Sequence, residues 1–184
     1  MKLLMIAAPG GGKGTQGERL SAKFGIQHVS SGDLLRAAAR AGTSAGREVA
    51  AYQERGDLVP DQIVLDLLTP VVTAAAARGG YILDGFPRTL PQAIAAADIG
   101  RRLDVTLDAA VYLNVPEALL TQRLLARARA DDTAEVIGHR LRVFAEATRP
   151  LIDYYRDRGI LLEVNGDQPP DAITADIVTR LPPA

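Results

Sequence analysis

Short apolar runs alternate along the chain with longer segments of helical pattern. Most of these runs lack polar residues at alternate positions, which is typical of strands that helices bury on both faces. The alternation of strand and helix predicts a parallel sheet covered by helices. We expect the strands at Leu3–Ala7, Gln27–Val29, Tyr81–Asp84, Ala109–Asn114 and Gly159–Val164.

Helical patterns fill the segments between these runs. Pro60, Pro116 and Pro170 stand where three of the predicted helices begin, a position that tolerates the missing N–H of proline. The helices are expected at Lys13–Phe24, Asp33–Ala41, Ala45–Arg55, Asp61–Arg78, Leu90–Ala97, Glu117–Arg127, Glu135–Arg158 and Asp171–Arg180.

Two segments interrupt the alternation. Residues from about 30 to 59 hold two helices after the second strand, and residues from about 126 to 134 are polar and rich in Arg and Asp. Because connecting segments often carry binding sites, both are predicted to be mobile flaps over a site. The length of 184 residues suits one α/β domain with small inserts, so residues 1–184 are expected to form a single domain.

Composition and charge narrow the classes of function. The chain has 47% hydrophobic residues and a net charge of -1, from 21 Lys plus Arg against 22 Asp plus Glu. This balance gives no electrostatic reason to expect nucleic acid or a membrane surface as partner. No stretch approaches the roughly 18 apolar residues of a membrane span. Cysteine is absent, which excludes disulfides and thiolate metal sites and fits a cytoplasmic location.

The strongest local motif lies directly after the first strand and opens the first helix. Residues 8–16 read Ala-Pro-Gly-Gly-Gly-Lys-Gly-Thr-Gln. The glycines let backbone N–H groups converge on an anion, and the helix N-terminus adds its dipole. Lys13 is expected to reach the outer phosphates, and the Thr15 hydroxyl to lie near Mg²⁺.

The strict phosphate-loop pattern G-x-x-x-x-G-K-[ST] nevertheless fails at two positions. Ala7 replaces the first glycine, and Gly14 stands where Ser or Thr is expected. We expect Ala7 to keep a negative φ, because a left-handed alanine would be strained. A flexible glycine-rich turn is the alternative, but such a turn seldom places a lysine between strand and helix. The loop alone predicts phosphate binding and leaves the activity open.

Gly14 is informative, because Gly-Lys-Gly-Thr-Gln resembles the form that this loop takes in the adenylate kinase family. The resemblance continues at matching spacing to about residue 170. It includes an AMP-side motif, an adenine-binding turn, the Asp-Gly-Phe-Pro-Arg-Thr signature with a following Gln, the lid arginines and a loop against the ATP base. These motifs are Ser30–Arg36, Gly56–Pro60, Asp84–Thr89 with Gln92, Arg123 with residues 127–132 and Arg140, and Asn165–Pro169.

The resemblance implies a fold of the P-loop NTPase type. This is a three-layer α/β structure with a five-stranded parallel sheet in the order 2-3-1-4-5 and right-handed crossovers. A helical AMP-side insert and a short lid would close over the nucleotides. Some relatives carry a longer lid with a four-cysteine zinc site, but this lid is short and has no cysteine, so no zinc is expected.

The resemblance also implies roles for individual residues. The implied catalytic residues are Lys13, Arg88, Arg123, Arg129 and Arg140. The implied ATP-binding residues are Gly10, Gly11, Gly12, Lys13, Gly14, Thr15, Arg123, Arg127, Gly166 and Gln168. The implied AMP-binding residues are Ser31, Arg36, Asp57, Leu58, Val59, Gly85, Phe86, Pro87, Arg88, Gln92, Arg129 and Arg140. For Mg²⁺, the implied residue is Asp84 through water, with Asp33 and Thr15 as further candidates.

Physical arguments support some of these roles more than others. The planar fork of arginine suits bidentate contact with phosphate, although a single Arg on a helix, such as Arg127 or Arg129, is usually a solvated surface charge. A carboxylate at the end of an apolar strand is costly unless it meets a cation, which favours Mg²⁺ at Asp84. The two histidines, His28 and His139, show no ligand spacing or partner. Tyr154 and Tyr155 are expected to pack a helix.

The predicted function is Mg²⁺-dependent transfer of a phosphoryl group, ATP + AMP = 2 ADP, by a cytoplasmic monomer. One alternative is a pyrimidine nucleoside monophosphate kinase of similar fold, which is expected to lack the arrangement from Thr89 to Gln92. The other is an inactive nucleotide-binding protein, for which Ala7 is the only support. ATP, AMP and ADP are the expected partners.

Overall fold

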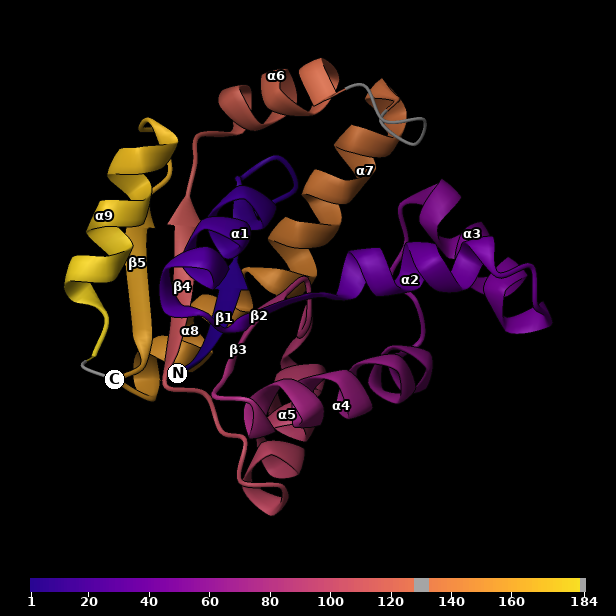
Figure 1. Cartoon of the computed structure of the whole chain (residues 1–184). Coiled ribbons are helices and arrows are strands. Elements are labelled where there is room, and N and C mark those ends of the chain that lie inside the picture. Colours follow the sequence, from indigo (N-terminus) through magenta and orange to yellow (C-terminus); the bar gives the residue numbers. More distant parts are fainter. Residues whose placement is uncertain (128–132, 183–184) are drawn as a thin grey trace.

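A five-stranded parallel sheet forms the centre of the protein in a computed structural model, which describes residues 1–127 and 133–182. The strands stand in the order β2-β3-β1-β4-β5, so the predicted α/β fold and strand order are confirmed (Figure 1). Their bounds are β1 Lys2–Ile6, β2 Gln27–Ser30, β3 Tyr81–Asp84, β4 Ala109–Asn114 and β5 Leu161–Asn165.

The central strands are apolar except at one end because both faces of the sheet are covered. Successive side chains of a strand point to opposite faces, so Leu3 and Leu4 of β1 enter two different cores. Both are 0% exposed. The core around Leu3 includes Leu20 and Ile177, and the core around Leu4 includes residues of the remaining helices. The lack of polar alternation in the sequence follows directly.

Helices cover the two faces unequally. Helices α1 and α9 supply the core around Leu3, while α2 to α6 and α8 supply buried residues to the other core (Figure 1). The bounds are α1 Lys13–Phe24, α2 Ser31–Arg40, α3 Ser44–Arg55, α4 Asp61–Ala77, α5 Leu90–Arg102, α6 Glu117–Arg127, α7 Ala134–Val143, α8 Pro150–Asp157 and α9 Pro170–Arg180.

Helices α2 and α3 pack on each other and extend away from the sheet (Figure 1). Each begins at a hydroxyl cap: Ser30 Oγ accepts from the Asp33 N–H, and Thr43 Oγ1 accepts from the Gly46 N–H. Helix α3 ends at Gly56, whose φ of 77° suits glycine. These local signals position the predicted AMP-side segment beside the carboxyl ends of the strands.

The prediction of one helix over Glu135–Arg158 is wrong. The chain there forms α7, a π-helical turn at Phe144–Thr148 and then α8. Pro150 has no N–H to donate and its ring would collide with the preceding turn of a regular helix. The Arg149 N–H instead reaches back five residues to the Phe144 carbonyl, at 2.9 Å. The wide turn lets the chain continue in nearly the same direction.

Helix α5 is longer than the predicted Leu90–Ala97. It continues to Arg102, and Gly100 is buried where the chain returns past it. A Cβ on Gly100 would lie 3.6 Å from the Thr106 Cα, which is ordinary van der Waals contact, so the position also has room for alanine. The chain leaves the helix just before Asp104, which has a φ of 54°.

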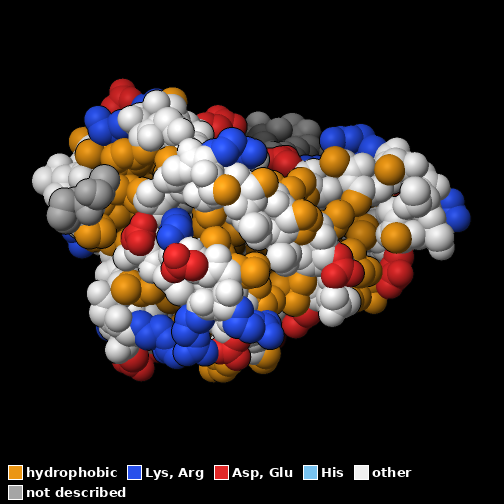
Figure 2. All heavy atoms as spheres, turned by 60° about the horizontal axis from the view of Figure 1, so that its bottom comes forward, with side chains coloured by type: hydrophobic (Ala, Val, Ile, Leu, Met, Phe, Trp, Pro, Cys, Tyr) orange, Lys and Arg blue, Asp and Glu red, His pale blue; other side chains and the backbone are white. Residues whose placement is uncertain are grey.

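The surface mixes apolar and charged side chains. On the face shown in Figure 2, hydrophobic side chains lie among basic and acidic ones. Three of the exposed large hydrophobic residues, Leu90, Ile94 and Leu103, lie in or beside α5. Within the described residues, no helix combines the length and apolar character needed to cross a bilayer.

Candidate nucleotide site

A cavity of about 880 Å³ lies where β1, β2 and β3 end. Residues from the glycine-rich loop, the insert, the loop after β3, α6 and α7 all line it. The predicted site residues among them are Gly10, Gly11, Gly12, Lys13, Gly14, Thr15, Ser31, Asp33, Arg36, Asp57, Leu58, Val59, Asp84, Gly85, Phe86, Pro87, Arg88, Gln92, Arg123, Arg140 and Gln168. The motifs found along the sequence therefore meet around one space.

The glycine-rich loop wraps directly into α1. Gly10 and Gly12 have φ values of 82° and 88°, which glycine adopts without strain. Because α1 begins at Lys13, its first N–H groups face the loop end of the cavity and suit an anion. Lys13 Nζ donates to the Ala7 carbonyl at 2.7 Å, which holds the ammonium group over the loop.

Ala7 fits the loop because Gly11 has no side chain. Among the described residues, the only non-glycine residue with a positive φ is Asp104, so the expected negative φ of Ala7 is confirmed. A Cβ added to Gly11 would lie 2.7 Å from the Ala7 Cβ, closer than two carbon atoms can approach. The methyl group of Ala7 thus occupies space that a side chain at Gly11 would need.

Ser31 is a buried residue at the start of α2 that lines the cavity. It is 1% exposed, and its Oγ has no hydrogen-bond partner in the part of the chain that the structure describes. A Cβ on Gly85 would lie 2.5 Å from that oxygen, so the two segments approach closely. An unmet buried hydroxyl is costly, and its presence in a cavity indicates a place for a polar ligand group.

Positive charge gathers around Arg88. Its Nε donates to the Gly85 carbonyl at 2.7 Å, which holds the guanidinium beside the loop after β3. The side chain is exposed to the open cavity, yet desolvation by the surrounding protein lowers the pKa of Arg88. Asp84 raises this pKa, while the charges of Arg140 and Arg36 lower it further. The guanidinium remains charged at neutral pH. It lies near other cations, and a bound anionic ligand would reduce the repulsion between them.

Asp84 is a buried carboxylate that lines the cavity. It ends β3, is 8% exposed and has His28 Nε2 at 3.6 Å from its Oδ2. Thr15 and Asp33 line the same cavity. The described residues contain no cluster of three acidic or histidine ligands. Mg²⁺ usually retains several waters and binds through one or two carboxylates together with substrate phosphates, so carboxylates such as Asp84 and Asp33 are a suitable donor set for it.

Gln92 is a buried amide and not a surface residue. It is 4% exposed and lies in the first turn of α5, which Thr89 caps. Its Oε1 accepts from the Arg88 N–H at 2.7 Å, and its Nε2 donates to Asp61 Oδ1 at 2.5 Å. The amide therefore lines the cavity in a fixed position.

The opposite end of the cavity is formed by α6 and the loop after β5. Arg123 Nη2 donates to the Gly166 carbonyl at 3.2 Å, and Gln168 Nε2 donates to the Asn165 carbonyl at 2.9 Å. Gly166 thus borders the cavity through Arg123 and does not line it directly. Arg129 and most of the predicted lid lie outside the described residues, as does the side chain of Arg127.

Comparison with known proteins agrees with this geometry. The family model described as adenylate kinase matches residues 5–160. The adenylate kinase of Leptospira biflexa is 42% identical over 98% of this chain and 99% of its own length. That of Synechococcus sp. WH7803 is 43% identical over 98% of each chain. The adenylate kinase of Rhodococcus erythropolis is 44% identical over 91% of this chain and 92% of its own.

The chain belongs to the adenylate kinase family. The resemblance drawn from the motifs and the assignment as an adenylate kinase, a nucleotide-binding phosphotransferase, are confirmed.

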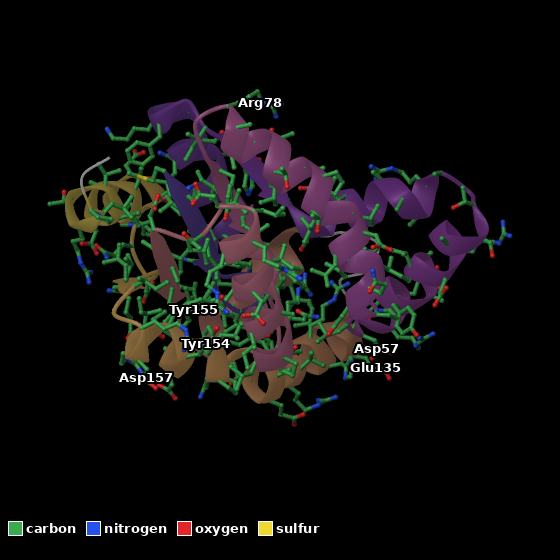
Figure 3. The ribbon with its side chains drawn as sticks, turned by 90° about the horizontal axis from the view of Figure 1, so that it is seen from below. Asp57, Arg78, Glu135, Tyr154, Tyr155 and Asp157 are labelled. Atoms are coloured by element: carbon green, nitrogen blue, oxygen red, sulfur yellow. The ribbon has the colours of Figure 1, made fainter. Side chains whose placement is uncertain are left out.

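Both histidines have carboxylate neighbours that the sequence did not indicate. His28 faces Asp84, and His139 Nε2 lies 2.9 Å from Asp57 Oδ1. Figure 3 shows Asp57 near Glu135, at the start of α7, and the Asp57–His139 contact joins the turn between α3 and α4 to α7. Arg55 first and His139 second lower the pKa of Asp57 through hydrogen bonds.

Thr148 is a further contact that sequence reasoning missed. It lies in the π-helical turn and is 8% exposed. Its Oγ1 donates to the Arg88 carbonyl at 2.8 Å, and this hydrogen bond ties the π-helical turn to the Asp84–Thr89 motif. The proline two residues later was the available signal, because it interrupts a helical pattern at this point. The expected packing of Tyr154 and Tyr155 is confirmed, with their rings edge to face at 5.0 Å (Figure 3).

Proposed function

We propose that this site catalyses reversible, Mg²⁺-dependent phosphoryl transfer, ATP + AMP = 2 ADP. The observation that carries the proposal is that one continuous cavity is lined both by the glycine-rich loop and by the residues assigned to the acceptor nucleotide. Four cations also line it: Lys13, Arg88, Arg123 and Arg140. Two nucleotides carry many negative charges, and positive charge must gather to hold them together.

The donor nucleotide is assigned to the end of the cavity formed by the loop and α6. Backbone N–H groups there suit phosphates, and Lys13 supplies a point charge. The proposed ATP-binding residues are Gly10, Gly11, Gly12, Lys13, Gly14, Thr15, Arg123, Arg127, Gly166 and Gln168.

The acceptor nucleotide is assigned to the insert side. The free Ser31 hydroxyl and the cations of Arg36 and Arg88 suit its phosphate, and Gln92 beside Leu58 and Val59 suits its base. The proposed AMP-binding residues are Ser31, Arg36, Asp57, Leu58, Val59, Gly85, Phe86, Pro87, Arg88, Gln92, Arg129 and Arg140.

The reaction requires the attacking and leaving oxygens to lie in line with the transferred phosphorus. The proposed catalytic residues are Lys13, Arg88, Arg123, Arg129 and Arg140, which would orient the phosphates and stabilise charge on the transferring group. Arg88 lies close enough to Asp84, Arg140 and Arg36 for their charges to shift its pKa, which supports a place for it among the cations of the cavity. No general base is obligatory, because little covalent chemistry falls to the protein.

The residues that would hold Mg²⁺ are Asp84, through bound water, with Asp33 and Thr15 beside it. When bound, the ion supplies neutralisation of charge on the donor phosphates. The assignment is supported by the position of Asp84, Asp33 and Thr15, which line the same cavity as the glycine-rich loop.

The AMP-side insert, residues 30–59, and the lid, residues 126–134, are proposed to close over the nucleotides within a single domain, residues 1–184. Closure would exclude water, so that AMP is phosphorylated in preference to hydrolysis of ATP. We propose a cytoplasmic monomer whose partners are ATP, AMP and ADP, with no role for nucleic acid, membrane or zinc.

An assay of ADP formation tests the proposal. ATP is combined with AMP, CMP or UMP, with and without Mg²⁺. We expect activity with AMP that depends on Mg²⁺ and competition by a dinucleoside polyphosphate against both substrates. Folded protein that forms no ADP would refute the proposed activity. A kcat/KM for CMP equal to or above that for AMP would favour a pyrimidine nucleoside monophosphate kinase.

A further inference from the structure

Two groups of the protein hold the Gln92 amide, one as a hydrogen-bond donor and the other as an acceptor. The Arg88 N–H donates to Oε1 at 2.7 Å, and Asp61 Oδ1 accepts from Nε2 at 2.5 Å. Asp61 is the first residue of α4, while Gln92 and Thr89 belong to the start of α5, so two helix N-termini meet at this amide.

These partners permit one orientation of the amide. A backbone N–H can only donate, and a carboxylate can only accept. Rotation of the amide by a half turn would set its NH₂ group against the Arg88 N–H and its oxygen against the Asp61 carboxylate. Two hydrogen bonds would become two repulsive contacts at a residue that is 4% exposed.

We propose that Asp61 is a specificity-determining positioning residue, which fixes the donor and acceptor order that Gln92 presents to the acceptor base. The inference rests on the proposed function, in which the AMP base docks against Gln92 in the cavity. An amide has two N–H donors and two lone pairs on its oxygen, so one N–H and one lone pair remain for a ligand.

AMP and IMP differ in the hydrogen-bonding edge of their bases. Adenine presents a ring nitrogen that accepts beside an amino group that donates. Hypoxanthine presents a ring N–H that donates beside a carbonyl that accepts. AMP and IMP share the sugar, the phosphate and the shape of the purine, so their ratio of kcat/KM isolates the polarity of the edge. The held amide suits AMP, and IMP would require the reversed amide.

The chain provides a matched control on the same helix. Asp66 Oδ1 accepts from Gln62 Nε2 at 2.7 Å, which is the same kind of amide–carboxylate contact. This second contact is exposed and neither residue lines the cavity. Replacement of Asp66 by asparagine therefore makes the same chemical change in α4 without affecting Gln92.

The test measures kcat/KM for AMP and for IMP at saturating ATP and Mg²⁺ in the wild type, Asp61→Asn and Asp66→Asn. An asparagine can donate as well as accept, so it no longer opposes the reversed amide. We expect Asp61→Asn to reduce the preference for AMP over IMP by about fivefold or more. Asp66→Asn should keep the wild-type preference.

A second variant keeps the inference testable if Asp61→Asn is poorly folded. In the double variant Asp61→Asn with Gln92→Glu, the new amide can donate to the new carboxylate, so the contact is retained with reversed polarity. The carboxylate would present only acceptors, so the edge of either base could make one hydrogen bond and would meet one repulsion. The preference for AMP over IMP should therefore fall by about fivefold or more.

Three results would overturn the inference. The AMP-to-IMP ratio could stay unchanged in Asp61→Asn, it could fall equally in Asp66→Asn, or the double variant could keep the wild-type ratio. Equal loss of both activities in Asp61→Asn would give the first of these results, and Asp61 would then be structural only. A wild type without activity on AMP would instead refute the proposed function, which separates the two failures.

Discussion

Replacement of Gly11 by alanine would place two methyl groups in space that now holds one. The added Cβ would lie 2.7 Å from the Ala7 Cβ and 2.9 Å from the Ala8 carbonyl oxygen. Carbon atoms in contact are usually about 3.5–4.0 Å apart, so the loop must move by several tenths of an ångström or more. Overpacking of this kind costs about 1–3 kcal/mol. We expect this loss in the free energy of unfolding, together with a higher KM for ATP.

A double-mutant cycle tests the cause. Ala7→Gly removes the opposing methyl group, so Ala7→Gly with Gly11→Ala should recover the part of the stability and of the affinity for ATP that the methyl contact costs, while the contact with the Ala8 carbonyl oxygen remains. The coupling energy between the two sites should be about 0.5–3 kcal/mol, measured by urea denaturation. Gly14→Ala serves as the control for stability. A Cβ at Gly14 meets nothing within 4 Å, and alanine inside a helix is favoured over glycine by roughly 0.5–1 kcal/mol. If the effects of the two substitutions simply add, the contact between Ala7 and Gly11 does not limit the loop.

Three further predictions concern residues around the cavity. Arg88→Ala should lower kcat by roughly 10³–10⁵ with little change in the binding of ATP, and a loss of less than about tenfold in steady-state kinetics would contradict its role. Thr148→Val removes the hydrogen bond to the Arg88 carbonyl, so the free energy of unfolding in urea should fall by about 1–3 kcal/mol, whereas an unchanged midpoint would show that this contact contributes nothing. The pKa of Asp57 is lowered in the folded protein, so its contribution to stability is complete above about pH 4 and is lost as the pH falls further. The difference in Tm between wild type and Asp57→Asn should therefore shrink in acid, and a constant difference down to about pH 2 would refute this assignment.

The main elements of the fold could be predicted from the sequence because helices cover both faces of the sheet. Strands such as Tyr81–Asp84 are apolar up to their last residue, and the prolines at helix starts mark boundaries. The break between α7 and α8 could not be read from apolar spacing, since the π-helical turn keeps apolar residues on both sides of it. Pro150 carried the signal, but proline also occurs within α4, at Pro70, without dividing that helix.

The lining of the cavity was predictable because each motif is local in sequence, as the loop around Lys13 illustrates. The contacts that hold these motifs were not predictable in this way. Asp61 meets Gln92 from 31 residues away, and Asp57 meets His139 from 82. Such pairs depend on which helix N-termini and turns the fold brings together. No local spacing distinguishes them from ordinary surface residues.

The π-helical turn sets the rotational phase between α7 and α8. Each residue of an α-helix advances about 100° around the axis, so one extra residue rotates everything after it by that angle. Helix α7 directs Arg140 to the cavity, whereas α8 buries Leu151, Ile152 and Tyr155 in the core. A segment that runs on almost without a bend can satisfy both demands only if its two halves are out of register. Deletion of a single residue between 144 and 148 would leave both helices intact and turn one of these faces away from its target.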